Sequence, residues 1–273
     1  MTSYHAVYFD VDGTLVDSRR HFDPNLLVVI RQLIANDIRI GLATGRMARS
    51  ALPFAQAIAA NAPLILYNGA QLVDPITTTV LKSHTLALNT AQHALAIVRQ
   101  CGAPHVNVYV DNEIVIEAES PISREYSLKD AVPLRPVGDL RRFLISDPVK
   151  LMIVVDDPSR IEPLSRQLHL GLPSPCPTIV NSEPTYLEIL PPGVTKGETL
   201  TAAAECLGVP LSGIVAFGDG LNDIELLQNA GLGIAMENAH AGLKAVADRV
   251  IGHHDTSSLA ETLRELFDLR PLA

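Results

Sequence analysis

Cysteine and positive charge are both scarce in this chain of 273 residues. The three cysteines, Cys101, Cys176 and Cys206, are widely spaced and odd in number, so they indicate neither a disulfide framework nor a thiolate metal cluster. We expect them to be buried, reduced thiols.

Lys and Arg total 21 against 30 Asp and Glu, a formal net charge of −9. This balance argues against nucleic acid or an anionic membrane as a partner, and a small anionic ligand would need a local positive site. No stretch approaches the roughly 18 apolar residues of a membrane span, and no basic segment near the start leads into a long apolar one. We therefore expect a cytoplasmic protein.

Strands and helices alternate over the first part of the chain. We predict strands at 6–9, 38–43 and 64–67, separated by helices at about 24–35 and 48–60. Asp23 and Pro24 indicate the start of the first helix, and Asn36 indicates its end. This spacing predicts a parallel sheet with right-handed crossovers.

The pattern changes near residue 82 and reverts near residue 192. Between these points we expect a helix at 89–100, a hairpin of strands at 106–110 and 114–118, and a strand, a helix and two short strands over 151–189, whereas 128–148 shows no clear period. Afterwards strands at 214–217, 231–236 and 250–251 alternate with helices at 196–207, 224–229, 241–247 and 257–267. We predict an α/β doubly wound, Rossmann-like core (1–81 and 192–273) with an inserted α+β cap domain (82–191).

Carboxylates follow two of the predicted core strands. Asp10 and Asp12 end the first strand, and Asp219 follows a late one. An Asp-x-Asp pair at a strand end can bring two like charges together, which favours a hard cation such as Mg²⁺ between them. Taken alone, each segment is also an ordinary turn. Because parallel strands end at one rim, Thr44 and Asn68 should gather near these carboxylates.

Four segments in this order resemble the motifs of the haloacid dehalogenase superfamily. They are Asp10-Val-Asp12-Gly-Thr14, Leu42-Ala-Thr44-Gly45-Arg46, Lys196 at a helix start, and Gly218-Asp219-Gly-Leu-Asn222-Asp223. The large insertion, with Tyr67-Asn68-Gly69-Ala70 and Leu187-Glu188-Ile189, resembles the Cof-type phosphatases with a C2-type (IIB) cap.

Phosphate-ester hydrolysis requires a nucleophile, neutralisation of the phosphoryl oxygens and a proton for the leaving group. Asp10 is the candidate nucleophile, forming an aspartyl-phosphate. The resemblance implies that Asp12 protonates the leaving alcohol and then activates water. It also implies that Lys196 is catalytic and contacts phosphate.

The remaining site residues are implied by the same resemblance. Mg²⁺ would be bound by the Asp10 carboxylate, the Asp12 main-chain carbonyl and the Asp219 carboxylate, with Asp223 reaching it directly or through water. Phosphate would be held by the following groups: Thr44, the backbone N–H groups of Val11 and Gly45, Lys196 and Asn222.

Three other features have simpler interpretations. We expect His253-His254-Asp255 to be an exposed loop rather than a metal cluster, occupying a place where the family often has a small acidic-Gly loop. Arg46 reads as a surface residue at a helix start, with anion steering as the alternative. Glu188 could orient Lys196, contact substrate or end a strand.

The expected function is that of a Mg²⁺-dependent phosphatase acting on small soluble phosphomonoesters: sugar phosphates, or phosphorylated cofactors such as pyridoxal phosphate or FMN-like compounds. Specificity should reside in the cap, which has few aromatic residues and no distinct Arg cluster. The alternatives are a phosphosugar mutase of the phosphomannomutase type and a catalytically silent phosphometabolite-binding protein. We expect a monomer or a weak homodimer.

Overall fold

The structure is a computed structural model that describes residues 4–102 and 105–269. The chain divides into two compact units. The first unit comprises Met1–Lys82 and Thr195–Ala273, and the second comprises Ser83–Val194.

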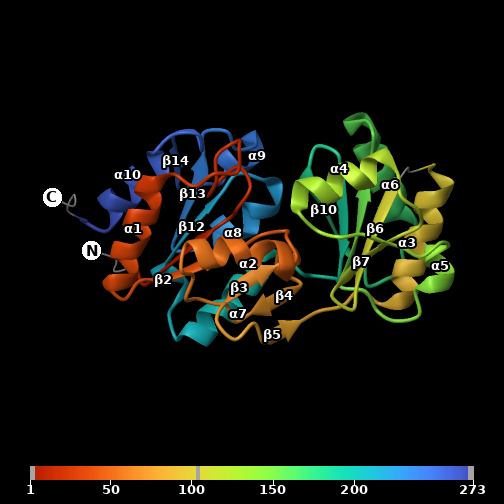
Figure 1. The fold of residues 1–273 in the computed structure, drawn as a ribbon, viewed down its shortest axis with the longest axis horizontal. Coiled ribbons are helices and arrows are strands. Elements are labelled where there is room, and N and C mark those ends of the chain that lie inside the picture. The colour runs from red at the N-terminus through yellow and green to blue at the C-terminus, as the bar shows by residue number, and fades with distance from the viewer. Residues whose placement is uncertain (1–3, 103–104, 270–273) are drawn as a thin grey trace. The chain divides into compact units, whose positions relative to one another are not determined.

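The first unit is built on a parallel sheet of five strands in the order β14-β13-β12-β1-β2 (Figure 1). Its strands are β1 (Ala6–Phe9), β2 (Arg39–Leu42), β12 (Ile214–Gly218), β13 (Leu232–Met236) and β14 (Arg249–Ile251). Its helices are α1 (Pro24–Ala35), α2 (Ala48–Ala57), α7 (Lys196–Leu207), α8 (Ile224–Asn229), α9 (Ala241–Lys244) and α10 (Ser258–Leu266). This confirms the predicted α/β core.

Helices cover both faces of this sheet, which is why polar and apolar residues do not alternate along β1. Ala6 and Tyr8 belong to an apolar cluster with residues of α7 and α8. Val7 and Phe9 point to the opposite face and are also fully buried. On the outside, α1 contacts both α10 and β2.

A second, smaller sheet in this unit was not predicted. Strand β3 (Leu64–Leu66), which was predicted, pairs with β4 (Gln71–Val73), and β5 (Val80–Ser83) completes the sheet. A single bridge between Ala43 and Ile65 continues the parallel main sheet to β3. The two missed strands are only three and four residues long, too short for a period to show.

The second unit contains a six-stranded sheet in the order β10-β11-β9-β6-β7-β8, antiparallel except for the β7–β8 pair. Its strands are β6 (His105–Val110), β7 (Glu113–Ile116), β8 (Arg135–Pro136), β9 (Lys150–Val154), β10 (Thr178–Glu183) and β11 (Tyr186–Leu190). Its helices are α3 (Leu88–Gln100), α4 (Pro121–Asp130), α5 (Leu140–Phe143) and α6 (Ile161–Gly171). An inserted α+β unit is therefore confirmed.

Helix α4 was missed because it has little amphipathic character. Its buried residues are Ser123 and Tyr126, so no apolar stripe marks it in the sequence. It begins instead with a capping box, in which the Ser120 side chain accepts from the Ser123 N–H and the Ser123 side chain accepts from the Ser120 N–H.

Two expectations drawn from the composition concern the cysteines and membrane-spanning segments. Cys101, Cys176 and Cys206 are exposed, so the prediction of buried thiols was wrong. Cys206 lies on the outer side of α7, whose buried residues include Leu200 and Ala203. Among the described residues, no helix is both long and apolar enough to cross a membrane.

Candidate active site

The carboxyl ends of three neighbouring strands carry the predicted site residues. Strand β1 pairs with β12 on one side and with β2 on the other. In both pairs the backbone hydrogen bonds continue one residue past the end of the strands. The Asp10 N–H donates to the Phe217 carbonyl at 2.9 Å, and the Ala43 N–H donates to the Phe9 carbonyl at 2.8 Å. Asp10, Thr44 and Asp219 therefore follow adjacent parallel strands and lie at one rim of the sheet.

Lys196 joins two of the carboxylates. It is the first residue of α7, whose N-cap Thr195 accepts from the Glu198 N–H. Its Nζ donates to Asp10 Oδ1 and to Asp223 Oδ1, each at 2.7 Å, and the residue is only 1% exposed. Because a buried charge is tolerated only when paired, these three side chains depend on one another.

Asp219 and Asp223 are held by the loop that follows β12. Thr14 Oγ1 donates to Asp219 Oδ1 at 2.9 Å. Asp223 Oδ2 accepts from the backbone N–H groups of Asp219 and Gly220, both at 3.0 Å. At Gly13, where φ is +79°, a Cβ would lie 2.3 Å from Asp219 Oδ2, so the close approach of this carboxylate requires glycine.

This cluster has more negative than positive charge, and the pKa values reflect it. Burial raises the pKa of Asp10 well above its usual range; Lys196 opposes the shift, and Asp223 and Asp219 add to it. Burial, together with the Asp223 carboxylate, raises the pKa of Asp219 to about 7. Burial lowers the pKa of Lys196, but Asp10 and Asp223 outweigh this effect, and the net shift is upward.

These residues suit a hard divalent cation. Asp10, Asp219 and Asp223 each offer a carboxylate oxygen, and the three oxygens lie within 4.8 Å of one another. Oxygen donors are the ligands that Mg²⁺ prefers. A cation would also favour the ionised forms that burial and, to a smaller extent, carboxylate repulsion disfavour at Asp10 and Asp219.

Asp12 has a different partner from Asp10. Arg46 donates from Nε to Asp12 Oδ2 and from Nη2 to Asp12 Oδ1, both at 2.7 Å, and Arg20 Nη2 lies 3.6 Å from Oδ1. The Arg46 guanidinium also stacks on the Phe54 ring, 4.9 Å from its centroid. With 7% exposure Arg46 is buried, so its interpretation as a surface residue was wrong. The Asp-x-Asp pair does not act as one equivalent pair.

Thr44 and Asn68 lie together beside Gly45. Thr44 is 2% exposed, and its Oγ1 accepts from the Arg46 N–H at 3.2 Å. The Asn68 N–H donates to the Thr44 carbonyl at 3.0 Å, and the Asn68 side chain faces Gly45, where a Cβ would lie 3.1 Å from the amide nitrogen.

Asn222 reaches this group through Asn68. Its Nδ2 donates to Asn68 Oδ1 at 2.9 Å, which orients the Asn68 amide. Asn68 Nδ2 is buried and, within the described part of the chain, has no hydrogen-bond partner. A buried amide N–H without a partner is costly, so this group is a donor available to a ligand.

The loop after Asp12 is braced by residues that sequence reasoning did not connect to the site. Asn238 Nδ2 donates to the Gly13 carbonyl at 2.8 Å, while its Oδ1 accepts from the His254 N–H at 3.2 Å. His254 Nδ1 lies 2.8 Å from the Val16 carbonyl, and Asp255 Oδ1 accepts from the Ser18 N–H at 2.7 Å. The expectation of an exposed loop was wrong for His254, whose side chain is 12% exposed.

A comparison with family models matches residues 7–263 to the haloacid dehalogenase-like hydrolases. The chain belongs to this family. It is 30% identical to a Haemophilus influenzae protein named "Putative phosphatase", over 97% of this chain and 98% of that protein. It is 28% identical to the pyridoxal phosphate phosphatase YbhA of Escherichia coli, over 94% and 96% of the two chains.

Among solved structures, a sugar phosphatase of haloacid dehalogenase subclass IIB has the same fold. The TM-score is 0.85 at 20% identity, over 97% of this chain and 99% of that one. The resemblance to Cof-type enzymes of this superfamily is therefore confirmed. Family membership and the curated relatives make the chain an enzyme of the phosphoric monoester hydrolase class.

In this haloacid dehalogenase-like hydrolase, Glu188 has a partner in its own unit. It forms an ion pair with Lys150, and both side chains are almost fully buried. The Lys150 ammonium also lies 4.7 Å from the centroid of the Tyr109 ring. Glu188 is the third of the five residues of β11 (Tyr186–Leu190), so its reading as a strand end was wrong. Its orientation of Lys196 and its contact with substrate stay predictions.

Proposed function

We propose that this protein is a Mg²⁺-dependent phosphatase that hydrolyses small soluble phosphomonoesters through an aspartyl-phosphate at Asp10. One observation carries the proposal: the buried Asp10 carboxylate lies 2.7 Å from the Lys196 ammonium and shares an acidic cluster with Asp219 and Asp223. A nucleophile, a cation to balance phosphate and oxygen ligands for a metal are thus available together.

In the first step an Asp10 carboxylate oxygen attacks phosphorus, and the bond from phosphorus to the leaving oxygen breaks. We assign to Asp12 the proton that the leaving oxygen takes up. In the second step Asp12 takes a proton from water, the water oxygen attacks phosphorus, and the bond to Asp10 breaks, releasing inorganic phosphate. The bidentate contact from Arg46 fixes the Asp12 carboxylate plane and favours its ionised form, which suits the second step, in which Asp12 takes the proton from water.

Mg²⁺ would be held by Asp10, the Asp12 main-chain carbonyl and Asp219, with Asp223 beside them. When bound, it would offset the repulsion between the Asp10 carboxylate and the anionic phosphate. Asp223 accepts from two backbone N–H groups, one of them that of Asp219, and from Lys196, which also binds Asp10. These contacts support a further role for Asp223 in holding the Asp10 and Asp219 carboxylates in place.

The phosphoryl oxygens would be bound by Thr44, Lys196 and the backbone N–H groups of Val11 and Gly45. To this set we add Asn68, whose buried Nδ2 needs an acceptor. Asn222, assigned to phosphate from the sequence, would then act partly by orienting the Asn68 amide.

The test is phosphate release with and without Mg²⁺ from a panel of sugar phosphates, pyridoxal phosphate and FMN. We include pyridoxal phosphate because one relative is a phosphatase for it. Asp10→Asn should lower kcat at least about 10³-fold, as removal of a nucleophile does. Asp37→Asn is the matched control because Asp37 is exposed and has φ of +61°, a conformation that Asn tolerates.

Three outcomes would contradict the proposal. Full activity in Asp10→Asn would show that Asp10 is not the nucleophile. If chromatography shows conversion of a sugar monophosphate to its isomer without phosphate release, the protein is a mutase. Binding of phosphate ligands without turnover at any Mg²⁺ concentration would indicate a catalytically silent binding protein.

A further inference from the structure

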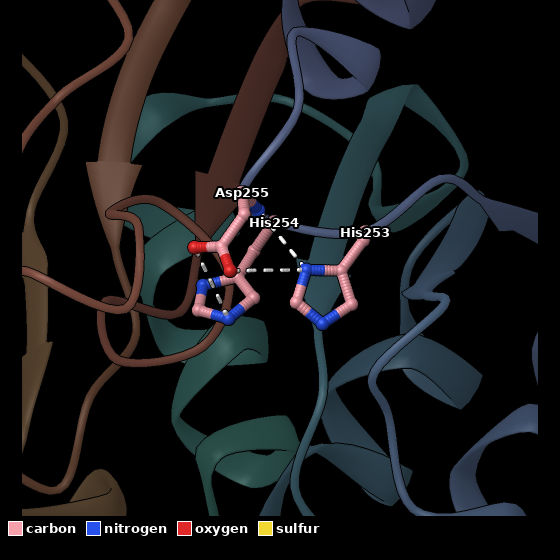
Figure 2. Close-up of side chains that lie close together, drawn as sticks. All are labelled: His253, His254 and Asp255. Atoms are coloured by element: carbon pink, nitrogen blue, oxygen red, sulfur yellow. Dashed lines mark hydrogen bonds and ion pairs between the residues drawn. The ribbon is translucent and has the colours of Figure 1, made fainter.

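The segment after β14 places two imidazoles and a carboxylate close together (Figure 2). His253 Nδ1 lies 3.6 Å from Asp255 Oδ2, and His254 Nε2 lies 3.9 Å from Asp255 Oδ1. One ligand atom from each residue lies within 4.8 Å of the other two. Tetrahedral Zn²⁺, with bonds of about 2.0–2.1 Å, spaces its ligand atoms by about 3.4 Å. Small side-chain movements would therefore complete a set of three ligands.

The hydrogen bond on the other side of His254 determines which ring nitrogen is available. A carbonyl oxygen can only accept, so His254 Nδ1, 2.8 Å from the Val16 carbonyl, carries the proton. In the neutral ring Nε2 then presents a lone pair toward the Asp255 carboxylate. Two acceptors that face each other at 3.9 Å leave room for a cation that both can bind.

We propose that His253, His254 and Asp255 form a binding site for a transition-metal ion of the Zn²⁺ class, separate from the acidic cluster at Asp10. Two imidazoles and one carboxylate favour Zn²⁺, Ni²⁺ or Co²⁺ over Mg²⁺, which prefers oxygen ligands. Water would complete the coordination. This inference goes beyond the proposed function.

The surroundings of the three residues match the outer contacts typical of metal sites. A metal-bound histidine usually donates its other N–H to a carbonyl or carboxylate, as His254 does to Val16. Asp255 Oδ1 is held by the Ser18 N–H. His253 Nδ1 accepts from the Asp255 N–H at 3.2 Å, a long hydrogen bond that a metal would replace. The side chains of His253 and Asp255 are 40% and 42% exposed, so an ion can enter from solvent.

This site would be coupled to the loop that carries Asp12. His254 and Asp255 hold Val16 and Ser18, at the end of the segment that begins with Asp10. Because a ligand that binds only the folded state stabilises it, Zn²⁺ should raise the melting temperature of the protein.

Zn²⁺ binding by the full-length chain, measured by calorimetry in excess Mg²⁺, tests the proposal. We expect one Zn²⁺ per chain, with affinity lowered about tenfold or more in His254→Gln and in Asp255→Asn, and a Zn²⁺-dependent rise in melting temperature that these variants lose. Asp219→Asn, which alters the acidic cluster, should still bind Zn²⁺. His21→Gln is the matched control, because His21 also lies near a carboxylate, 3.9 Å from Asp17, but has an exposed side chain.

Unchanged affinity and stoichiometry in the double variant His253→Gln, His254→Gln would overturn the site, as would loss of Zn²⁺ binding in Asp219→Asn alone. Failure of the wild-type chain to bind Zn²⁺ would also overturn the proposal. Circular dichroism would show that each variant is folded. Because no readout uses catalysis, the result is independent of the phosphatase activity.

Discussion

At the scale of single residues, the two aspartates of the first motif differ by their partners. Asp10 is bound to a buried lysine, whereas Asp12 is bound by the guanidinium of Arg46. The lysine provides a point charge that can be shared with phosphate, and the guanidinium provides a rigid fork that fixes a carboxylate. The two neighbours thus suit different roles: a nucleophile beside a cation that phosphate can share, and an ionised carboxylate held in a fixed plane for proton transfer.

Replacing Arg46 by Lys tests the second of these roles. A lysine cannot make both hydrogen bonds to Asp12, so we expect kcat to fall about 10-fold to 100-fold on an alkyl phosphate, with a smaller change in KM. The loss should be smaller on p-nitrophenyl phosphate, whose leaving group needs little protonation. Arg49→Lys, at an exposed position of α2, is the control. An equal loss on both substrates would mean that Arg46 does not act through proton transfer.

Replacing Lys196 by Met tests the dependence among the buried charges. The change leaves Asp10 and Asp223 without their cation, and breaking a buried pair in this way costs about 3–5 kcal/mol. Urea unfolding at pH 7 without metal measures this loss in the free energy of unfolding, with Lys244→Met as the control. Adding Asp223→Asn to Lys196→Met should restore part of the stability but not the activity. A loss below about 1 kcal/mol would contradict the pairing.

At the scale of elements, the segments after two strands together support the first motif. The segment after β13 provides Asn238 and the segment after β14 provides His254 and Asp255, and together they hold the loop after β1. These contacts are possible, although β12 lies between β13 and β1, because the loops after parallel strands leave the same rim of the sheet.

Asn238→Ala should weaken this support. It removes a donor to the Gly13 carbonyl and an acceptor for the His254 N–H, so we expect the free energy of unfolding to fall by about 1–3 kcal/mol. We also expect a lower kcat, since the loop carries Asp12. Urea unfolding and steady-state kinetics measure both effects. Asn25→Ala, in the first turn of α1, is the control. Unchanged kcat with reduced stability would limit Asn238 to a structural role.

At the scale of the whole molecule, the acidic cluster links stability to pH and metal. The pKa of Asp219 is about 7 in the folded protein against an ordinary value of 3.8. Between these values the folded state binds more protons than the unfolded state, so this group makes the metal-free protein less stable as pH rises from about 4 to 7. A bound cation removes the cost of the charged form.

Mg²⁺ should therefore raise the melting temperature more at pH 8 than at pH 5. Thermal unfolding with EDTA or with Mg²⁺ across this range measures the difference. Asp219→Asn should remove most of it, and Glu261→Gln, an exposed position on α10, should not. An equal effect of Mg²⁺ at both pH values would show that Asp219 is not protonated in the metal-free protein.

Much of the fold followed from local patterns. The start of α1 at Asp23 and Pro24 and its end at Asn36 were visible because capping depends on a few adjacent residues. The positions of Asp10, Thr44 and Asp219 at one rim followed from their places after buried strands, since parallel strands end on the same side.

The partners of these residues were decided only by the tertiary structure. Arg46 and Asp12 are 34 positions apart, Asn222 and Asn68 are 154 apart, and His254 and Val16 are 238 apart. In the sequence, Arg46 is a helix-start arginine and His254 a loop histidine. Local propensity depends on neighbouring residues, whereas burial, hydrogen-bond partners and the resulting pKa values depend on which distant segments the fold brings together.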